Sequence, residues 1–546
     1  MHRVTRVLLL EVTLGALAVL TAPLGGSAAV GAQEQQGAST TARWILHIQN
    51  YPGGISAGVR ATYAAALEKA RLGVSPGAFL PGTVFGRNNL QMNTDYSPAM
   101  PQNETAVALD NANPMVAVAA SNDYGNNGLR VMYTSDGGLH WGNTEIIPEV
   151  RWKGENCGGG GDPALAFSIR DDAFYASQLC FSGDGSSEVH VYKSEDGGQT
   201  WTPGRRAAVA VSNFDPGSNT IDTSLFYDHE FITVDNSPVS PYFGRVYVTY
   251  AKFHMEPDGF SDYCPIQIAY TDAIRTVDPS VAVWNHTGVV PDNPGGTGKG
   301  PTANQDGIAR TEANGAVDVT YVFEDCNTGL DRHLAFNKSA DGGASFMPNP
   351  VRIDKRGQFD DNPNLDDHLG PTPFRAPLGP GFDISPATGT LAYVYQNNVN
   401  RAQSGADISI SLSHDGGMTW SDARFLSTQA GNPAPEDQFF PAIASDENGK
   451  FFAIWFDRRR DPADTKIDTW EATSGNDGAT WKSRRISSLS WDPFRGFFQC
   501  GCFIGDYNQV AASTTAVYPV WTDGRDSAID QTGIGETDIF TNVEIR

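Results

Sequence analysis

The sequence predicts an all-β fold, namely a β-propeller built from four-stranded blades. The 546 residues include 58 glycines and 33 prolines, which indicates many turns. Strand-like runs of alternating apolar residues, such as EVHVYK at 188–193, lead into these turns as the arms of β-hairpins. One octet recurs at the turns, as TSDGGLHW at 134, SEDGGQTW at 194, SADGGASF at 339, SHDGGMTW at 413 and SGNDGATW at 474.

The spacing of the octets defines the repeat unit. Their Asp or Asn residues stand at 136, 196, 341, 415 and 476, so consecutive copies lie 60, 145, 74 and 61 residues apart. The long interval holds a unit whose octet has been lost, around residues 268–284, and the last unit ends with the chain before an octet. Each unit also has an aromatic strand and, before it, a short strand with a polar or acidic opening. This period is typical of propeller blades. Seven blades are favoured, and six remain an alternative if one unit is an insertion.

The region before the propeller, which we place at 96–546, has two parts. Residues 1–32 combine Arg3 and Arg6 with an apolar stretch and a small-residue exit, which predicts a secretory signal peptide. An uncleaved membrane anchor is the alternative. Residues 33–95 form a leader with one short helix over 61–73. In this leader, RWILHIQN at 43–50 could donate a strand that closes the ring with the last blade, and a disordered linker is the alternative.

The net charge and the cysteine content limit which binding partners and which cellular compartment we expect for the protein. A formal net charge of −25 repels phosphate backbones, so we expect no nucleic acid partner. After signal cleavage we expect a secreted monomer with no membrane association. An even number of cysteines in an exported chain predicts structural disulfides whose pairing stays open. The cysteines are Cys157, Cys180, Cys264, Cys326, Cys500 and Cys502, of which the last two could instead form a local bridge.

The octet has the chemistry of a self-supporting turn. Its Asp accepts hydrogen bonds from backbone N–H groups, its Ser or Thr adds another, and its glycine adopts a conformation that other residues resist. In this form the octet is similar to the Asp-box, or bacterial neuraminidase repeat. Over residues 100–546 the chain resembles the sialidase superfamily of propellers. Resemblance to secreted bacterial sialidase-like proteins extends to FIGDYNQVAA at 503, DQFFPAIASDENGKFFAIWFDRRRDP at 437 and YDHEFITVDNSPVSPYFGRVYVTY at 227.

The resemblance implies a secreted glycoside hydrolase of the exo-α-sialidase type, which acts on glycans at the mouth of the central channel. It also implies that the octets are scaffold turns away from the active centre, and that six blades are usual. A non-catalytic propeller that binds glycan or protein at the same rim is the alternative. A different hydrolase or lyase on the same scaffold is a third option, because fold does not fix function.

The innermost strand of each blade lines the channel, so the residues that open these strands form the candidate site. Glycoside hydrolysis needs a carboxyl group as acid or base and a second group as nucleophile or base. The catalytic candidates are Asp162, Asp228, Glu230, Asp437, Asp506 and Tyr507. The substrate-binding candidates are Glu104, Asp306, Gln438 and Arg375, the last because PFRAP at 373 resembles the sialidase element around the first substrate-binding arginine. The alternative for each carboxylate, Asp383 included, is that it caps a strand and satisfies loop N–H groups.

Two further features concern ions and ion pairs. Arg458 in FDRRRD and Arg525 in TDGRD are predicted to occupy the same place in two blades, where each forms an internal ion pair with an Asp. No cofactor or metal is expected, but DDNPNLDDHLG at 360 leaves a calcium site open, because it offers hard oxygen ligands. Since it lacks the spacing of a calcium loop, a solvated acidic loop is the main interpretation. Its acidic residues are Asp360, Asp361, Asp366 and Asp367.

Overall fold

The structure is a computed structural model of the chain. It describes residues 41–51, 53–72, 83–85, 89–94, 100–274, 277–290, 304–328, 332–355, 357, 359, 375–496, 503–525 and 536–546. The predictions that fall outside these residues are the signal peptide at 1–32, the calcium loop with Asp360, Asp361, Asp366 and Asp367, and the pair Cys500 and Cys502.

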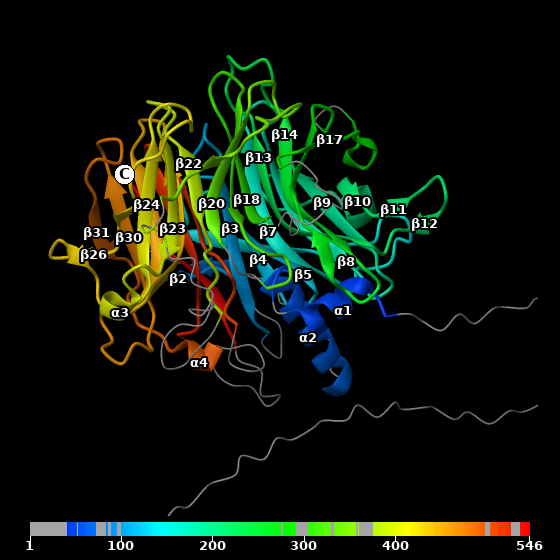
Figure 1. Ribbon diagram of the computed structural model, residues 1–546, viewed down its shortest axis with the longest axis horizontal. Helices are drawn as coiled ribbons and strands as arrows, with labels where there is room; N and C mark the ends of the chain where they lie inside the picture. The colour runs from blue at the N-terminus through cyan, green and yellow to red at the C-terminus, as the bar shows by residue number, and fades with distance from the viewer. Residues whose placement is uncertain are drawn as a thin grey trace, which may run out of the picture. The chain divides into compact units, whose positions relative to one another are not determined.

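The described strands form a seven-bladed β-propeller of antiparallel sheets (Figure 1). From the innermost strand outwards, blade 1 contains β3 (Gln102–Leu109), β4 (Ala117–Asp123), β5 (Gly128–Thr134) and β6 (His140–Ile146), with β1 (Thr83–Phe85) beside β6. Blade 2 contains β7 (Gly159–Ser168), β8 (Ala173–Phe181), β9 (Ser187–Ser194) and β10 (Ala208–Ser212). Blade 3 contains β13 (Leu225–Val234), β14 (Val246–Met255), β16 (Ile266–Thr271) and β17 (Asn285–Gly288), with β15 (Ser261–Tyr263) beside β14.

The second half of the ring follows the same plan. Blade 4 contains β18 (Asn304–Thr311), β19 (Val317–Phe323), β20 (His333–Ser339) and β21 (Val351–Arg352). Blade 5 contains β22 (Gly381–Ile384), β23 (Leu391–Asn397), β24 (Asp407–Ser413) and β25 (Arg424–Phe425). Blade 6 contains β28 (Gln438–Ser445), β29 (Phe451–Asp457), β30 (Asp468–Ser474) and β31 (Lys482–Arg485). Blade 7 contains β32 (Gln509–Ala512), β33 (Ala516–Asp523) and β34 (Asp538–Thr541), with β35 (Glu544–Ile545) beside β33.

The remaining elements are short, apart from two helices before the first blade. These are α1 (Arg43–Asn50) and α2 (Ala57–Leu72), and α2 includes residues 61–72 of the helix predicted over 61–73. Two small hairpins pair β11 (Phe214–Asp215) with β12 (Thr220–Ile221) and β26 (Thr428–Gln429) with β27 (Asn432–Pro433). The other helices are α3 (Arg401–Ser404), α4 (Pro493–Gly496) and the 3-10 turns η1 (Gly204–Arg206) and η2 (Pro279–Val281). None of the helices in the described ranges is long and apolar enough to cross a membrane.

The ring is closed by a strand from the N-terminal region. The fourth strand of blade 7 is β2 (Leu90–Gln91), which pairs with β34 through Leu90 opposite Thr541. The suggestion that RWILHIQN supplies this strand is wrong, because those residues form α1. The side chains of Trp44 and Ile45 are buried in the core there, packed with blades 2, 3 and 4. Both β1 and β2 come from the predicted leader, so the propeller draws on residues upstream of 96.

The octets join each blade to the one before it. In the second copy, Ser194 Oγ donates to Asp196 Oδ1 at 2.9 Å, and the Gly198 amide donates to Ser194 Oγ at 2.9 Å. Gly198 has a φ of +90°, and a Cβ there would lie 2.5 Å from Val118 of blade 1. The corresponding glycines of the other copies, Gly138, Gly343, Gly417 and Gly478, likewise meet side chains of the preceding blade. The octets therefore stabilise the ring from its outer side.

Candidate functional site

The innermost strands line a partly open pocket at the centre of the ring, which we call the channel cavity. Strands β7, β13, β18, β22, β28 and β32, or the residues next to them, all contribute to its wall. Its polar lining residues are His229, Glu230, Asp306, Arg310, Tyr507, Asn508 and Gln509, and Phe231, Ile308, Phe382, Ile443 and Val510 are among the apolar ones. An apolar wall with a few converging polar groups is the usual composition of a ligand pocket.

A β-bulge in the inner strand directs side chains of several blades toward the centre. The strand register shifts at this point in β3, β7, β13, β18 and β28. The residues at the shifts adopt positive φ values although none is glycine: Glu104 (57°), Asp162 (53°), His229 (49°), Asp306 (55°) and Phe440 (52°). Such a conformation costs about 1–3 kcal/mol per residue and typically occurs at functional sites. The bulges therefore bring together groups that a regular strand would direct elsewhere.

Six carboxyl groups from five blades gather in this region, and all are buried. They are Glu104, Asp162, Asp228, Glu230, Asp306 and Asp506, and we call them the acidic cluster. Burial raises the pKa of Asp162 to about 7, and the nearby charge of Asp228 adds to this effect. Burial also raises the pKa of Glu104 well above its usual range, with further contributions from Asp162 and Asp506. The protonated forms of Asp162 and Glu104 are therefore favoured, which relieves charge repulsion in the cluster.

Glu230 is the carboxyl group best suited to act as an acid. Its side chain lines the channel cavity, the residue is 3% exposed, and neither carboxyl oxygen has a hydrogen-bond partner. Burial raises its pKa well above the usual range, and the negative charge of Asp162 raises it further. Burial thus favours the protonated form of Glu230, whose carboxyl group faces the cavity.

Asp306 differs from Glu230 because it has a cationic partner. His229 Nε2 lies 3.1 Å from Asp306 Oδ1. Burial lowers the pKa of His229, but the charges of Asp306 and Asp162 outweigh it and the pKa is raised. Burial raises the pKa of Asp306, and His229 opposes this change. His229 therefore favours the ionised form of Asp306, whereas Glu230 has no such partner, and a difference of this kind is typical of an acid and base pair.

Tyr507 also lines the cavity, next to His229. The ring centroids of His229 and Tyr507 are 5.7 Å apart, and the Tyr507 hydroxyl lies 3.4 Å from the carbonyl oxygen of Pro163. Burial raises the pKa of Tyr507 well above its usual range, and the charges of Glu104 and Asp162 raise it further. The phenolate form is therefore disfavoured. The catalytic role that the sequence suggests for Tyr507 stays a prediction. The geometry leaves it as an aromatic surface within the cavity.

Asp506 and Arg375 meet at the edge of the acidic cluster. The Arg375 Nε atom lies 3.1 Å from Asp506 Oδ1, and the Asp506 amide donates to Glu104 Oε1 at 3.1 Å. The structure thus brings Arg375 into the region that the sequence predicted, but its guanidinium pairs with a carboxylate of the protein. Another arginine, Arg310, lines the cavity and pairs with Asp383 at 3.0 Å.

The N-terminal end of α2 covers Glu104, Asp162 and Asp228, so these three carboxyl groups do not lie at an open channel mouth. The Ser56 amide donates to Asp228 Oδ2 at 2.6 Å. A Cβ on Gly58 would lie 2.4 Å from Asp162 Oδ1 and 2.7 Å from Glu104 Oε2. The N-terminal end of a helix carries partial positive charge and unpaired N–H groups, which favour anionic partners. We call residues 53–60 the helical cap.

Arg60 and Gln305 fix the position of the helical cap. The Arg60 guanidinium donates to the carbonyl oxygens of Ile48, Tyr51 and Gly53. Burial and the nearby charge of Arg375 lower the pKa of Arg60 to about 10. The Gln305 amide donates to Gly54 O at 3.1 Å and to Asp228 Oδ2 at 2.9 Å, which links the cap to the cluster. Sequence reasoning missed this element, although the glycines of YPGGISAG at 51–58 permit its close approach.

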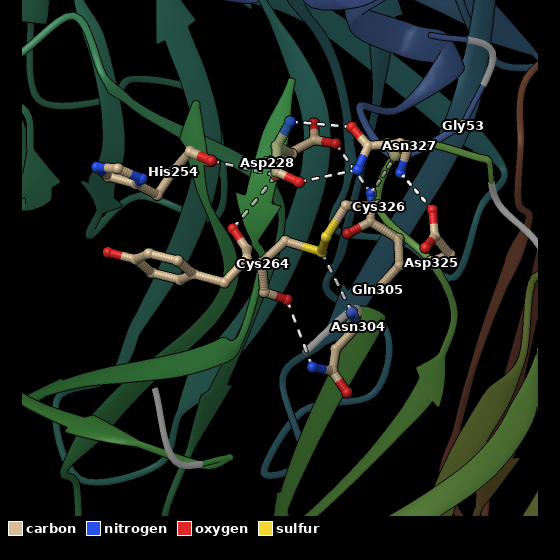
Figure 2. The surroundings of a disulfide bond; sticks show 12 residues. Gly53, Asp228, His254, Cys264, Asn304, Gln305, Asp325, Cys326 and Asn327 are labelled. Atoms are coloured by element: carbon tan, nitrogen blue, oxygen red, sulfur yellow. Dashed lines mark hydrogen bonds between the residues drawn. A yellow bond between two sulfur atoms is a disulfide. The ribbon is translucent and has the colours of Figure 1, made fainter. Parts of the chain in front are cut away.

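A disulfide supports the loop on which the cap rests (Figure 2). Cys264 of blade 3 is bonded to Cys326, which follows β19 of blade 4. The Gly53 amide donates to Asn327 O at 3.1 Å, and a Cβ on Gly54 would lie 2.0 Å from Cys326 O. Figure 2 shows Gly53, Asp228 and Gln305 among the residues around this disulfide. The second disulfide joins Cys157 to Cys180 within the blade 2 region, so four of the predicted cysteines form structural disulfides.

Asp437 and Gln438 lie outside the channel cavity. Asp437 Oδ1 accepts a hydrogen bond from the Ala406 amide at 2.8 Å, and its other oxygen lies 3.8 Å from Arg458. The Gln438 amide donates to the carbonyl oxygens of Pro435 and Glu436. Asp383 bonds Ser445 and Arg310. These contacts match the alternative that the sequence left open, in which such residues cap strands and loops.

The recurrent Asp–Arg pairs are internal, but the sequence alignment of the two arginines was wrong. The Arg459 guanidinium binds Asp457, two residues earlier, and Arg525 binds Asp523 in the same way. Trp455 donates to Asp457 and Trp521 to Asp523, so Arg459 is the structural counterpart of Arg525. Arg458 is fully buried instead beside Asp437 and Asp464.

The acidic cluster has no preformed metal geometry. Among the described residues, no three of its carboxyl groups have ligand atoms within 4.8 Å of one another.

Comparison with known proteins gives similarities only to solved structures. Models of protein families give no match, and neither do curated proteins. A protein of unknown function from Dyadobacter fermentans is 13% identical, with 73% of this chain and 97% of that chain covered and a TM-score of 0.42. The Hadza microbial sialidase Hz136 is 14% identical, with 79% and 73% covered and a TM-score of 0.40. An α-L-arabinanase from Penicillium chrysogenum, solved with arabinobiose, is 12% identical, with 69% and 92% covered and a TM-score of 0.41. The propeller assignment rests on the strand pairing described above.

Proposed function

We propose that the protein is a secreted glycan hydrolase whose active site is the channel cavity, with Glu230 as the general acid. The observation that carries the proposal is the place of Glu230 in the cavity wall, where its carboxyl group is buried without a hydrogen-bond partner and its pKa is raised. A general acid of this kind contributes about 10²–10⁴-fold to the rate of proton transfer steps. The described disulfides fit an extracellular protein and support the secretion part of the proposal.

In this mechanism Glu230 gives its proton to the oxygen of the leaving group as the glycosidic bond breaks. Asp306, held by His229, is the second carboxyl group and acts as base or nucleophile on the sugar. Tyr507 supplies an aromatic surface for the sugar ring, and Asn508 and Gln509 supply amide groups for its hydroxyls. Exclusion of water by the apolar wall strengthens each of these polar contacts.

Neutral sugars suit this cavity better than anionic ones. Arg310 is already paired with Asp383, and an anionic sugar would also meet the negative charge of Asp306. The sialidase type of activity is the second candidate, and the observation that favours it is the fivefold repetition of an octet that resembles the Asp-box. A sialoside would need Arg375 to leave Asp506 and turn to the substrate carboxylate.

The test compares the wild type with Glu230→Gln on fluorogenic glycosides, namely a panel of neutral α- and β-glycosides and one sialoside. Asp415→Asn serves as the control, because Asn476 occupies the same octet position naturally. We expect turnover of a neutral glycoside that falls by about 10²–10⁴-fold in Glu230→Gln and is unchanged in the control. Turnover of the sialoside alone would favour the second candidate. Glycan binding without turnover of any substrate would replace the proposal with a non-catalytic propeller.

A further inference from the structure

A second polar cluster lies in blade 2 and contributes nothing to the channel cavity. It consists of Cys157, Cys180, Glu188 and His190, and we call it the thiol cluster. Cys180 on β8 is the direct cross-strand partner of Glu188 on β9. His190 lies two residues beyond Glu188, so strand alternation places both side chains on one face of the sheet. The fourth member, Cys157, reaches this face through its disulfide with Cys180, in which the two Cα atoms are 5.5 Å apart.

The thiol cluster has the composition and spacing of a metal site. One ligand atom from each of Cys180, Glu188 and His190 lies within 4.8 Å of the other two, and in the described part of the chain no other group of such residues meets this limit. All three residues are buried, with exposures of 0%, 1% and 0%. Zn²⁺ prefers four ligands drawn from thiolate, imidazole and carboxylate groups in a tetrahedral arrangement. Cys157 completes such a set when the disulfide is open.

The residues around the cluster already orient its ligands. His190 Nδ1 lies 3.1 Å from the Tyr192 hydroxyl, and His190 Nε2 lies 2.9 Å from Glu188 Oε2. Glu188 Oε1 accepts a hydrogen bond from Ser212 Oγ at 2.8 Å. A metal-binding histidine usually donates its second ring N–H to a fixed partner, which sets the tautomer. When Nδ1–H is donated to Tyr192, any proton between Nε2 and Glu188 Oε2 is the one that a cation would replace, and the cation would then meet the Nε2 lone pair and Glu188 Oε2 at the same point.

We propose that the thiol cluster binds Zn²⁺ through Cys157, Cys180, Glu188 and His190 when the Cys157–Cys180 disulfide is reduced. A dithiol reductant supplies the two electrons that break the S–S bond, and it leaves as a cyclic disulfide. Its two thiol protons pass to the two cysteine sulfurs. Zn²⁺ then displaces one proton from each thiol as the two Zn–S bonds form.

The disulfide and the metal are mutually exclusive because they use the same two sulfur atoms. Either one links the segment around Cys157 to β8 of blade 2, so this cross-link persists in reducing and in oxidising surroundings. Disulfides form in oxidising compartments and thiols persist in reducing ones. The cluster thus gives blade 2 a metal cross-link before oxidation and a covalent one after it.

The test uses Cys157→Ser, which frees the Cys180 thiol without any reductant. Cys264→Ser is the matched control, because it frees the equally buried Cys326, which has no comparable metal-ligating group around it among the described residues. Each variant is titrated with Co²⁺, which reports thiolate coordination by a charge-transfer band, and then with Zn²⁺ as competitor. We expect a stoichiometric band in Cys157→Ser and none in Cys264→Ser. Equal spectra from the two variants would overturn the proposal.

Two further substitutions in the Cys157→Ser background separate a metal site from an exposed thiol. His190→Ala is expected to abolish the band. Tyr192→Phe, which removes the partner of Nδ1, is expected to weaken Co²⁺ binding by roughly tenfold or more. A band that survives His190→Ala unchanged contradicts the assignment of the ligands.

Thiol protection in the wild-type chain gives a readout that does not depend on the folding of a variant. After reduction with a phosphine, Zn²⁺ is expected to slow alkylation of Cys157 and Cys180, measured by mass spectrometry of peptides. Cys264 and Cys326 are the internal control and should react at the same rate with and without Zn²⁺. Equal effects of Zn²⁺ on both pairs, or none on either, would count against the site.

Discussion

The backbone amide of Ser56 donates to Asp228 Oδ2 at 2.6 Å, so the helical cap and the innermost strand of blade 3 share a buried hydrogen bond. The same turn places Gly58 against Asp162 and Glu104. The cap therefore forms one wall of the acidic cluster and contributes to its burial. Because burial is the first cause of the raised pKa values of Glu104 and Asp162, the cap favours the protonated forms of these two carboxyl groups.

Gly58→Ala should therefore destabilise the protein. The added Cβ would lie under 3 Å from the carboxyl oxygens of Asp162 and Glu104, so the first turn of α2 must shift. We expect a loss of about 1–3 kcal/mol in the free energy of unfolding, measured by chemical denaturation. Faster hydrogen exchange of residues 53–60 should accompany it. Gly183→Ala is the control, because nothing lies within 4 Å of a Cβ there, and it should change stability by less than about 0.5 kcal/mol.

The pattern of inner-strand openings indicates which strands face the channel but does not give the position of the bulge. Glu104, Asp162 and Asp306 occupy the bulge itself, and Asp228 and Glu230 flank the bulge residue His229. In blade 6 the bulge residue is Phe440, so Asp437 and Gln438 precede it and turn to their own loop. A one-residue offset decides where a side chain points, and composition does not encode that offset. The sequence therefore located the ring and most of the cluster, but it assigned these two residues to the wrong place.

The position of the helical cap could not be predicted from the sequence, for a different reason. Its helix is visible from residues 61–73, but the contact between Gly58 and Asp162 joins segments more than a hundred residues apart. No local signal specifies such a partner. Ring closure by Leu90 and Gln91 could not be predicted either, because a strand of two residues leaves no periodic pattern in the sequence.

Stability should decline as the pH rises from about 4 to about 7. The native state holds the proton of Asp162, whose pKa is about 7, whereas the unfolded chain loses it near its ordinary value of about 4. Between these values the native state binds more protons, so the free energy of unfolding falls by up to about 1.4 kcal/mol per pH unit for each such proton. Asp162→Asn removes one titrating group and should flatten this slope. Denaturation at a series of pH values measures both chains, and equal slopes would refute the account.

At lower pH the free energy of unfolding should instead fall as the pH falls, because the octet aspartates have lowered pKa values. Burial raises the pKa of Asp196, but hydrogen bonds from Thr200 and Ser194 outweigh it. The stabilising contribution of the octet aspartates is fully present above the ordinary aspartate pKa and is lost as the pH falls through the lowered value. Maximum stability is therefore expected under mildly acidic conditions.

Asp415→Ala should destabilise the ring without loss of activity. Asp415 accepts hydrogen bonds from the Thr419 amide at 2.9 Å and from Ser413 Oγ at 2.9 Å, and both are lost with alanine. We expect a cost of about 1–2 kcal/mol in the free energy of unfolding. Asp415→Asn should cost less, because Asn476 makes the corresponding bonds from its side-chain oxygen in blade 6. If Asp415→Ala abolished turnover of the neutral glycoside but left stability unchanged, the octet would be part of the active site rather than its support.

Removal of the Cys264–Cys326 disulfide should affect both stability and the helical cap. The two cysteines are 62 residues apart, and a closed loop of that length stabilises a protein by about 4 kcal/mol through the entropy of the unfolded chain. The pair Cys157–Cys180 spans 23 residues and should contribute about 3 kcal/mol. The serine double variant of each pair tests this order by chemical denaturation.

The two double variants should also differ in the hydrogen exchange of the helical cap, and this difference is the more informative one. Because Cys326 and Asn327 contact Gly54 and Gly53, only loss of the Cys264–Cys326 bond should speed hydrogen exchange of residues 53–60. A looser cap exposes the acidic cluster to water, so the pH dependence of stability should also weaken in that variant. Equal exchange at the cap in the two variants would mean that the disulfide stabilises blades 3 and 4 but does not position the cap.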